Sequence, residues 1–207
     1  MGKDWIKKQK KDKYYIQAQK EGMRSRAAYK LRQIQTKFKI LNGANLILDL
    51  CCAPGSWIEE VKRQFGDDIS IVGVDLANIA PIKQVDFIKG DITDSTIITK
   101  LKESLPTEVD VILSDCSPKI TGHRETDYAR LLFLTEKILQ LAFLFLRKGG
   151  HLVLKLFDGP STKKIRDHLK LNFEYVALFK PEASRKKSPE LYLIGKTYKK
   201  RREKFIL

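Results

Sequence analysis

The stretch Leu46-Ile-Leu-Asp-Leu-Cys-Cys-Ala-Pro-Gly-Ser-Trp57 joins an apolar run to a turn of small residues. A short apolar run bounded by a turn is typical of a strand buried on both faces of a parallel sheet. A helix is expected to open at Ser56 as its N-cap, with Glu59 three residues further on. Strand, tight turn and helix in this order predict the first unit of an α/β sheet, whose ligands bind beyond the carboxyl ends of the strands.

The alternation of strands and helices continues to about residue 195. Repeated units with short loops predict an α/β fold with a mostly parallel, doubly wound, seven-stranded sheet and helices on both faces. Gly149-Gly150 is expected to end the longest helix and to start the fifth strand. Beyond residues 46–50, the strands are expected at 69–74, 85–88, 109–113, 151–157, 174–179 and 190–195, and the helices at 94–104, 126–146 and 161–171.

Residues 1–45 differ in character from the rest and predict a basic helical extension packed on a core of residues 46–207. Ser25 can cap a helix there. Apolar side chains at helical spacing fall on one face of that helix: Ala27, Ala28, Leu31, Ile34 and Phe38. A chain of 207 residues fits a single domain overall.

The net charge of +15 is concentrated at the two ends of the chain. Residues 1–39 carry 13 lysines and arginines against three acidic residues, and residues 180–207 carry ten against three. This segregation favours a polyanionic partner such as RNA, although a solvated charged surface is the alternative. The candidate phosphate contacts are Arg24, Arg26, Lys37, Arg185, Lys186 and Lys187.

Three cysteines, two of them adjacent as Cys51-Cys52, do not form a sensible disulfide framework or a zinc site. They therefore predict a reducing cytosol and no metal. No apolar run reaches the length of a membrane span, and the N-terminus lacks the apolar region of a secretion signal. We expect a cytoplasmic protein, monomeric and not bound to membrane.

Acidic residues follow two of the predicted strands at the edge where ligands bind. Asp75 ends the second strand, 20 residues after Gly55, and Gly90-Asp91 follows the third. A carboxylate at the first position can accept hydrogen bonds from both hydroxyls of a ribose, and one at the second suits an adenine amino group. Because the turn before Ser56 is not a phosphate-binding G-x-G-x-x-G, these residues favour an adenosyl ligand without phosphates. Ordinary turn residues are the alternative.

Lys155 interrupts the apolar run His151-Leu-Val-Leu-Lys-Leu-Phe157 near the end of a predicted strand. A lysine in such a position is rarely buried without a partner. The carboxylates that the strand order brings nearest are Asp115 and Glu190, and Lys30 lies on the preceding basic helix.

In these segments the sequence resembles the FtsJ/RrmJ (RlmE-like) ribose 2′-O-methyltransferases, above all the large-subunit ribosomal RNA branch as found in archaea. The resemblance extends in order over nearly the whole chain. The matching segments are Arg24–Leu31, Leu48–Trp57, Gly73–Leu76, Gly90–Ile92, Ser114–Pro118, Val153–Phe157 and Ser184–Leu193. Ser56 stands where many relatives have glycine, and Cys51-Cys52 where Gly-Ala or Cys-Ala is commoner.

The resemblance implies a Rossmann-like class I methyltransferase that uses S-adenosylmethionine to methylate a ribose 2′-hydroxyl, on a uridine of large-subunit ribosomal RNA. It places the family's Lys-Asp-Lys-Glu tetrad on Lys30, Asp115, Lys155 and Glu190. It places the cofactor contacts on Gly55, Trp57, Asp75, Asp91 and Asp115.

Several alternatives stay open at this point. Lys155 can act as a general base, or as a charged group that orients the 2′-oxygen, depending on whether burial and Lys30 or the carboxylates dominate its pKa. The substrate can instead be a tRNA anticodon loop. A non-catalytic RNA-binding ribosome-assembly factor, and a base methyltransferase with Cys116 as nucleophile, are the alternatives of other kinds.

Overall fold

A computed structural model describes residues 12–200 of the chain. Its seven strands form one sheet in the order β3-β2-β1-β4-β5-β7-β6. The first five strands run parallel, and β7 is antiparallel to both of its neighbours. The strands are β1 (Leu46–Leu50), β2 (Ser70–Asp75), β3 (Val85–Lys89), β4 (Val109–Ser114), β5 (Leu146–Phe157), β6 (Phe173–Phe179) and β7 (Glu190–Tyr198).

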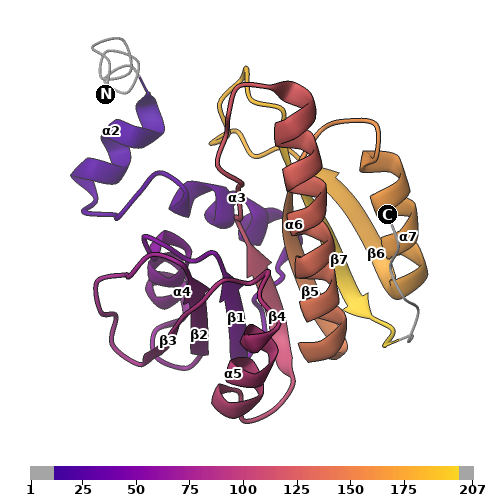
Figure 1. Ribbon diagram of the computed structural model, residues 1–207. Coiled ribbons are helices and arrows are strands. Elements are labelled where there is room, and N and C mark those ends of the chain that lie inside the picture. The colour runs from indigo at the N-terminus through magenta and orange to yellow at the C-terminus, as the bar shows by residue number, and fades with distance from the viewer. Residues whose placement is uncertain (1–11, 201–207) are drawn as a thin grey trace.

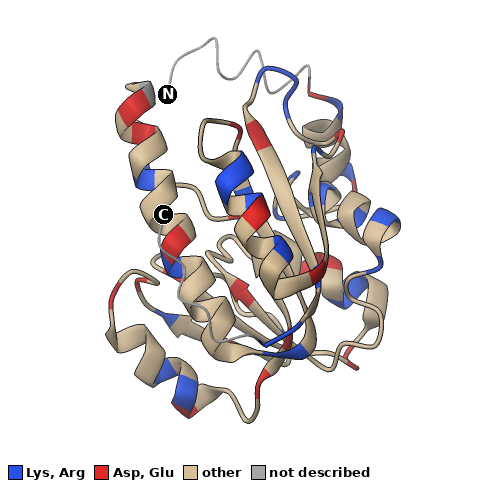
Figure 2. Ribbon diagram, turned by 90° about the vertical axis from the view of Figure 1, so that its right-hand side faces the viewer, with Lys and Arg blue, Asp and Glu red and all other residues tan. Residues whose placement is uncertain are grey.

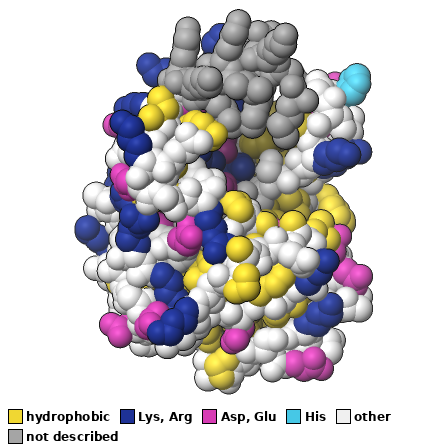
Figure 3. All heavy atoms as spheres, turned by 90° about the vertical axis from the view of Figure 1, so that its left-hand side faces the viewer, with side chains coloured by type: hydrophobic (Ala, Val, Ile, Leu, Met, Phe, Trp, Pro, Cys, Tyr) yellow, Lys and Arg dark blue, Asp and Glu magenta, His cyan; other side chains and the backbone are white. Residues whose placement is uncertain are grey.

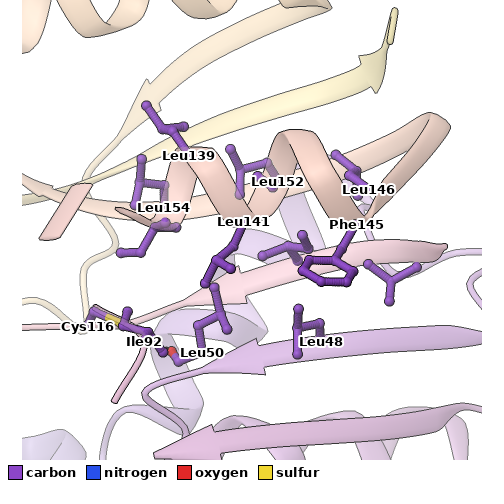
Figure 4. Packing of buried hydrophobic residues seen from close by; sticks show 14 of the residues in the cluster. Leu48, Leu50, Ile92, Cys116, Leu139, Leu141, Phe145, Leu146, Leu152 and Leu154 are labelled. Carbon is purple, nitrogen blue, oxygen red and sulfur yellow. The ribbon is translucent and has the colours of Figure 1, made fainter. Parts of the chain in front are cut away.

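Helices cover both faces of this sheet, which confirms the predicted doubly wound architecture (Figure 1). The helices are α2 (Lys13–Lys20), α3 (Ala28–Phe38), α4 (Ser56–Phe65), α5 (Thr96–Ser104), α6 (Arg124–Phe145) and α7 (Thr162–Asn172). Buried apolar side chains of α3 and α4 cover one face of the sheet, and those of α5, α6 and α7 cover the other. Figure 4 shows the packing on the face covered by α5, α6 and α7, where Leu139, Leu141 and Phe145 of α6 lie against leucines of the strands.

The position of β1 explains where a ligand can bind. Strand β1 pairs with β2 on one side and with β4 on the other, so the chain winds away from it in both directions. This reversal of strand order opens a crevice at the carboxyl ends of β1 and β4. Most strand residues are uncharged (Figure 2), so the few charged side chains at these strand ends stand out.

The N-terminal extension contributes to the main core through α3. Leu31, Ile34 and Phe38 are buried in the cluster that also contains β1 and α4, as the helical spacing predicted. The capping prediction was wrong, because α3 begins at Ala28 with no side-chain cap. The Ser25 hydroxyl instead accepts from the Ala27 amide and lies 2.6 Å from the Ser56 hydroxyl.

Two further helix ends differ from the expectation. Helix α4 has Gly55 as its N-cap, in the left-handed region at φ 98°, and Ser56 is its first residue. Helix α6 ends at Phe145, before the glycine pair, and β5 starts at Leu146. The pairing of β4 with β5 shifts register beside the glycines. At Gly150 a Cβ would lie 2.8 Å from the Asp110 carbonyl oxygen. Glycine at this position therefore allows the close approach of β5 to β4, and the glycine pair does not end a helix.

The expectation of no disulfide was also wrong. Cys51 and Cys116 form a disulfide across 65 positions of sequence. The reason lies in the sheet: Leu50 and Ser114 are register partners at the ends of β1 and β4, which brings the residues beyond them together. Cys52 is free and buried. Among residues 12–200, no helix combines the length and apolar character that a membrane span requires.

We expect the pair of substitutions Cys51→Ser and Cys116→Ser to lower the free energy of unfolding by about 2–4 kcal/mol, since the cross-link restrains a long loop of the unfolded chain. Urea unfolding monitored by circular dichroism measures this. Reductant should lower the stability of the wild type by a similar amount and leave the double variant unchanged. Equal stability of oxidised wild type and double variant would contradict the role of the cross-link.

Candidate active site and cofactor pocket

Four charged side chains from distant parts of the sequence meet beyond the carboxyl ends of β4 and β5. Lys155 Nζ lies 3.3 Å from Asp115 Oδ1 and 3.4 Å from Glu190 Oε2. Lys30, on α3, approaches the same acids, with Nζ 2.8 Å from Glu190 Oε1 and 3.6 Å from Asp115 Oδ2. The structure therefore brings together all four residues of the predicted tetrad, as two amines alternating with two carboxylates.

Two neighbours that the sequence reasoning missed hold the acids in place. The Tyr192 hydroxyl donates to Asp115 Oδ1 at 2.6 Å, and the Ser184 hydroxyl donates to Glu190 Oε1 at 2.7 Å. Tyr192 pairs with Lys155 across β5 and β7, so both side chains lie on one face of the sheet. The two-residue period of β7 from Glu190 to Tyr192 was the signal that could have found Tyr192.

The opposite charges of the tetrad keep the Lys155 amine and the Glu190 carboxyl group ionised. Burial lowers the pKa of Lys155, but Asp115 and Glu190 outweigh it and raise that pKa above the ordinary lysine value. Burial raises the pKa of Glu190, but Lys30 and Lys155 outweigh it and lower that pKa to about 2. In the free protein Lys155 is therefore an ammonium, which favours the orienting role over that of a ready-made base.

A cavity of about 690 Å³ lies between the ends of β1, β2 and β3 and helix α6, and its lining includes Ser117, two residues beyond the tetrad residue Asp115. Asp75 and Asp91, the two carboxylates singled out at the strand ends, both line it. Apolar side chains that include the exposed Leu76 and Phe133 form much of its wall, and Figure 3 shows hydrophobic side chains gathered on the face seen from the left of Figure 1. Its volume suits a small-molecule ligand.

The two cavity carboxylates also make turn contacts. Asp75 accepts from the amides of Ala53 and Ala77, and Asp91 Oδ1 accepts from the amide and hydroxyl of Thr93. The first of these bonds ties the end of β2 to the loop after β1. These contacts fix where the carboxylates lie along the cavity.

Neither Gly55 nor Trp57, the other predicted cofactor contacts in this loop, lines that cavity. A Cβ at Gly55 would come within 3.1 Å of Arg24 Nη1, so the loop needs glycine there. The Trp57 ring is buried, donates from Nε1 to the Ala27 carbonyl and lies 5.9 Å from the Tyr192 ring. The indole thus joins α3 to the sheet.

Asp49, within β1, is a further candidate that the sequence reasoning did not single out. It lines a smaller cavity together with Cys51, Trp57 and Asp115. Its Oδ2 is buried without a hydrogen-bond partner, and burial, followed by Asp115 and Asp75, raises its pKa well above the ordinary value. A buried acid that lacks a partner fits a cationic ligand, and S-adenosylmethionine carries both a sulfonium and an ammonium group.

The residues predicted to contact RNA phosphates fall into two groups, those bonded within the protein and those exposed to solvent. Arg24 donates to Glu59 and to the carbonyls of Pro54 and Ala80, and it thereby braces the loop after β1. Arg26 pairs with Asp12 and donates to the Ala183 carbonyl. The others, Lys37, Arg185, Lys186 and Lys187, are exposed. Two of the predicted RNA contacts thus serve the protein's own structure.

Cys116 does not fit the role of a nucleophile. It is buried and bonded to Cys51, so no free thiolate is present at that position. The site instead offers the charged oxygen and nitrogen groups of the tetrad, and Asp115 lines a small cavity together with Asp49. A Rossmann-like sheet with this crevice and this tetrad defines a class I methyltransferase.

The comparisons with known proteins then give the family. A model of the FtsJ-like methyltransferase family matches residues 23–198, and the chain belongs to this family, whose methyl donor is S-adenosylmethionine. A protein of Methanococcus vannielii named ribosomal RNA large subunit methyltransferase E is 40% identical over 95% of this chain and 76% of its own length. The protein of the same name from Methanothermobacter thermautotrophicus is 36% identical over 96% of this chain and 95% of its own.

Solved structures agree with the sequence relatives. The crystal structure of a ribosomal RNA methyltransferase, described as putative, from Plasmodium falciparum has a TM-score of 0.76 and 31% identity, covering 84% of this chain and 98% of that one. A putative class I S-adenosylmethionine-dependent methyltransferase from Listeria monocytogenes, at 14% identity, has a TM-score of 0.56 over 85% of this chain and 61% of its own. The second likeness concerns the fold alone.

If Lys155 orients the reacting oxygen, we expect Lys155→Ala to reduce methyl transfer by at least about 100-fold, because that group is lost. Binding of S-adenosylmethionine, measured by calorimetry, should stay largely intact. Lys163→Ala is the matched control, since that lysine is 81% exposed on α7. A Lys155→Ala enzyme with a near-wild-type rate would remove Lys155 from the mechanism.

The lowered pKa of Glu190 also predicts a dependence of stability on pH. Its pKa falls from 4.5 to about 2 on folding, so the stabilisation is present above pH 4.5 and is lost as the pH falls through 2. The loss amounts to roughly 3 kcal/mol. Urea unfolding at pH 6 and pH 2.5 should show a smaller decrease for Glu190→Gln than for the wild type, and equal decreases would contradict the pairing.

Proposed function

We propose that this protein transfers a methyl group from S-adenosylmethionine to the 2′-hydroxyl of a ribose in RNA, and that its substrate is a uridine of large-subunit ribosomal RNA. The observation that carries the proposal is the tetrad, in which the Lys155 ammonium is held between Asp115 and Glu190, and Asp115 also lines the small cavity next to Asp49. The names of the relatives support ribosomal RNA as the substrate.

Three carboxylates of the chain can bind the cofactor. Asp75 can accept hydrogen bonds from ribose hydroxyls, Asp91 can accept from an adenine amino group, and Asp49 can face the cationic end. Gly55 keeps the loop after β1 free of a side chain. S-adenosylmethionine supplies a methyl group that is already activated, and its leaving group departs as a neutral thioether that needs no acid.

Lys155 then orients the nucleophile. Its ammonium donates a hydrogen bond to the ribose 2′-oxygen, and Lys30 holds the two acids that fix Lys155. Alignment of two reactants can contribute on the order of 7–11 kcal/mol in favourable systems. The hydroxyl proton becomes acidic as the oxygen is alkylated, and the Asp115 carboxylate can accept it. Selection of RNA over DNA follows because the 2′-hydroxyl is itself the reacting group.

Exposed basic residues complete the proposed site. Lys37 and the loop of Arg185, Lys186 and Lys187 supply positive charge for phosphates, and binding should weaken steeply with salt. We further propose that the protein acts as a monomer in the cytoplasm, with RNA as its partner.

The test is methylation of the organism's ribosomal RNA and tRNA with methyl-labelled cofactor, followed by digestion and identification of the labelled nucleosides. We expect label in 2′-O-methyluridine from large-subunit ribosomal RNA. Label in tRNA riboses would show that the substrate is a tRNA anticodon loop instead. Label on bases would overturn the proposal. Cofactor binding without transfer to any RNA would indicate the non-catalytic assembly factor.

A further inference from the structure

The free edge of the sheet carries a cluster of aromatic rings next to the end of α3. Strand β6 is the last strand in the sheet order, and its residues Tyr175 and Phe179 face Phe38 of α3. The Phe38 ring lies 5.4 Å from Phe179 in an edge-on contact and 6.4 Å from Tyr175. Tyr175 is 50% exposed, so one side of this aromatic cluster is open to solvent.

Two lysines contact this cluster, and a third follows it in sequence. Lys37 Nζ lies 4.6 Å from the centre of the Phe179 ring, and Lys196 Nζ donates to the Phe38 carbonyl at 2.9 Å. Lys196 is also the register partner of Tyr175, and Lys39 follows Phe38 directly. We call Lys37, Lys39, Tyr175, Phe179 and Lys196 the β6-edge surface.

Several basic residues of the N-terminal segment are neutralised by acids of the protein, whereas the lysines of the β6-edge surface are not. Arg24 and Arg32 form ion pairs with Glu59 and Glu60. Within residues 12–200, no carboxylate lies within ion-pair distance of Lys37, Lys39 or Lys196. Unneutralised cations beside a half-exposed aromatic ring favour a ligand that carries negative charge and flat rings.

This surface leads directly to the tetrad. Phe179 is the register partner of Tyr192, whose hydroxyl contacts Asp115. On α3, Lys37 follows the tetrad residue Lys30 by seven positions. Two helical turns place them on nearly the same side of the helix, about 10 Å apart along its axis. A chain bound at the tetrad therefore reaches the β6-edge surface within a few nucleotides.

We propose that the β6-edge surface binds the unpaired nucleotides next to the methylated ribose. A base stacks on the open side of Tyr175, and Lys37, Lys39 and Lys196 neutralise the neighbouring phosphates. Stacking on aromatic rings with lysines along the backbone is the general mode of single-strand binding, and a paired base would not expose its face in this way. The inference rests on the proposed function, because it treats the tetrad as the place of the reacting ribose.

The test compares binding of a 5′-labelled single-stranded oligoribonucleotide and of the same sequence as a duplex, measured by fluorescence anisotropy. Tyr175→Ala should weaken single-strand binding by about 5- to 100-fold, the range for loss of one stacked base, and Tyr175→Phe should retain it. Lys37→Gln should weaken binding and reduce its salt dependence. Lys163→Ala, on α7, is the matched charge control and should bind as the wild type does.

Activity provides a second readout for the same variants. With the ribosomal RNA substrate, Tyr175→Ala should raise KM with little change in kcat or in cofactor affinity. Thermal unfolding checks that the variant is folded, as expected for a half-exposed side chain. Unchanged single-strand binding in Tyr175→Ala, as a surface for a protein partner would give, overturns the inference. Equal loss in Lys163→Ala, or equal affinity of the wild type for single strand and duplex, overturns it as well.

The binding assay also separates this inference from the proposed function. It needs neither methyl transfer nor a known target nucleotide. If the wild type fails to methylate any ribose but Tyr175→Ala still loses single-strand binding, the proposed function fails and the RNA surface stands. If ribose methylation occurs and Tyr175→Ala binds normally, only the surface is overturned.

Discussion

The position of Lys155 between two carboxylates is the interaction on which the rest of the site depends. An ammonium this deeply buried is costly unless its partners are close and fixed. Asp115 and Glu190 satisfy that condition, and each is in turn held by a hydroxyl, from Tyr192 and Ser184. Removal of one member leaves an unpaired charge in the interior, so the four residues are best regarded as a single unit. In the proposed mechanism the Lys155 ammonium of this unit donates to a ribose oxygen, so the same buried charge that is costly to fold performs the chemistry.

The cofactor side of the crevice is restrained by the backbone as much as by side chains. Strands β1 and β4 lie side by side, and the Cys51–Cys116 disulfide joins the segments that follow them. Arg24 braces the loop after β1 from the other side, through Glu59 and the Pro54 carbonyl. Because this loop is held from both sides, the neighbouring Asp49 and Asp75 need little rearrangement when a ligand binds. Binding to such a preformed pocket costs less conformational entropy.

The positive charge of the chain divides into two kinds in the folded protein. Arg24 and Arg26 near the crevice form ion pairs with the protein's own acids, whereas Lys37, Lys39 and Lys196 at the sheet edge have no carboxylate partner among the described residues. Net charge alone indicated a polyanionic partner, but the pairing pattern shows where the charge remains available. The RNA path proposed here follows that pattern, from the tetrad along α3 to β6.

The sequence alone determined the order of strands and helices along the chain and the mostly parallel sheet, because apolar periodicity is a local feature. The tetrad was implied by the resemblance to a family, whose motifs can also be read along the chain. The tertiary structure decided what depends on register and distance. The Cys51–Cys116 bond was not foreseen, since a sequence separation of 65 hides the adjacency of β1 and β4. The charge state of Lys155 was open, because opposing effects on its pKa can be weighed only with distances known. Asp49 and Tyr192 emerged for the same reason: a residue in a strand shows its partners only when its neighbours across the sheet are in place.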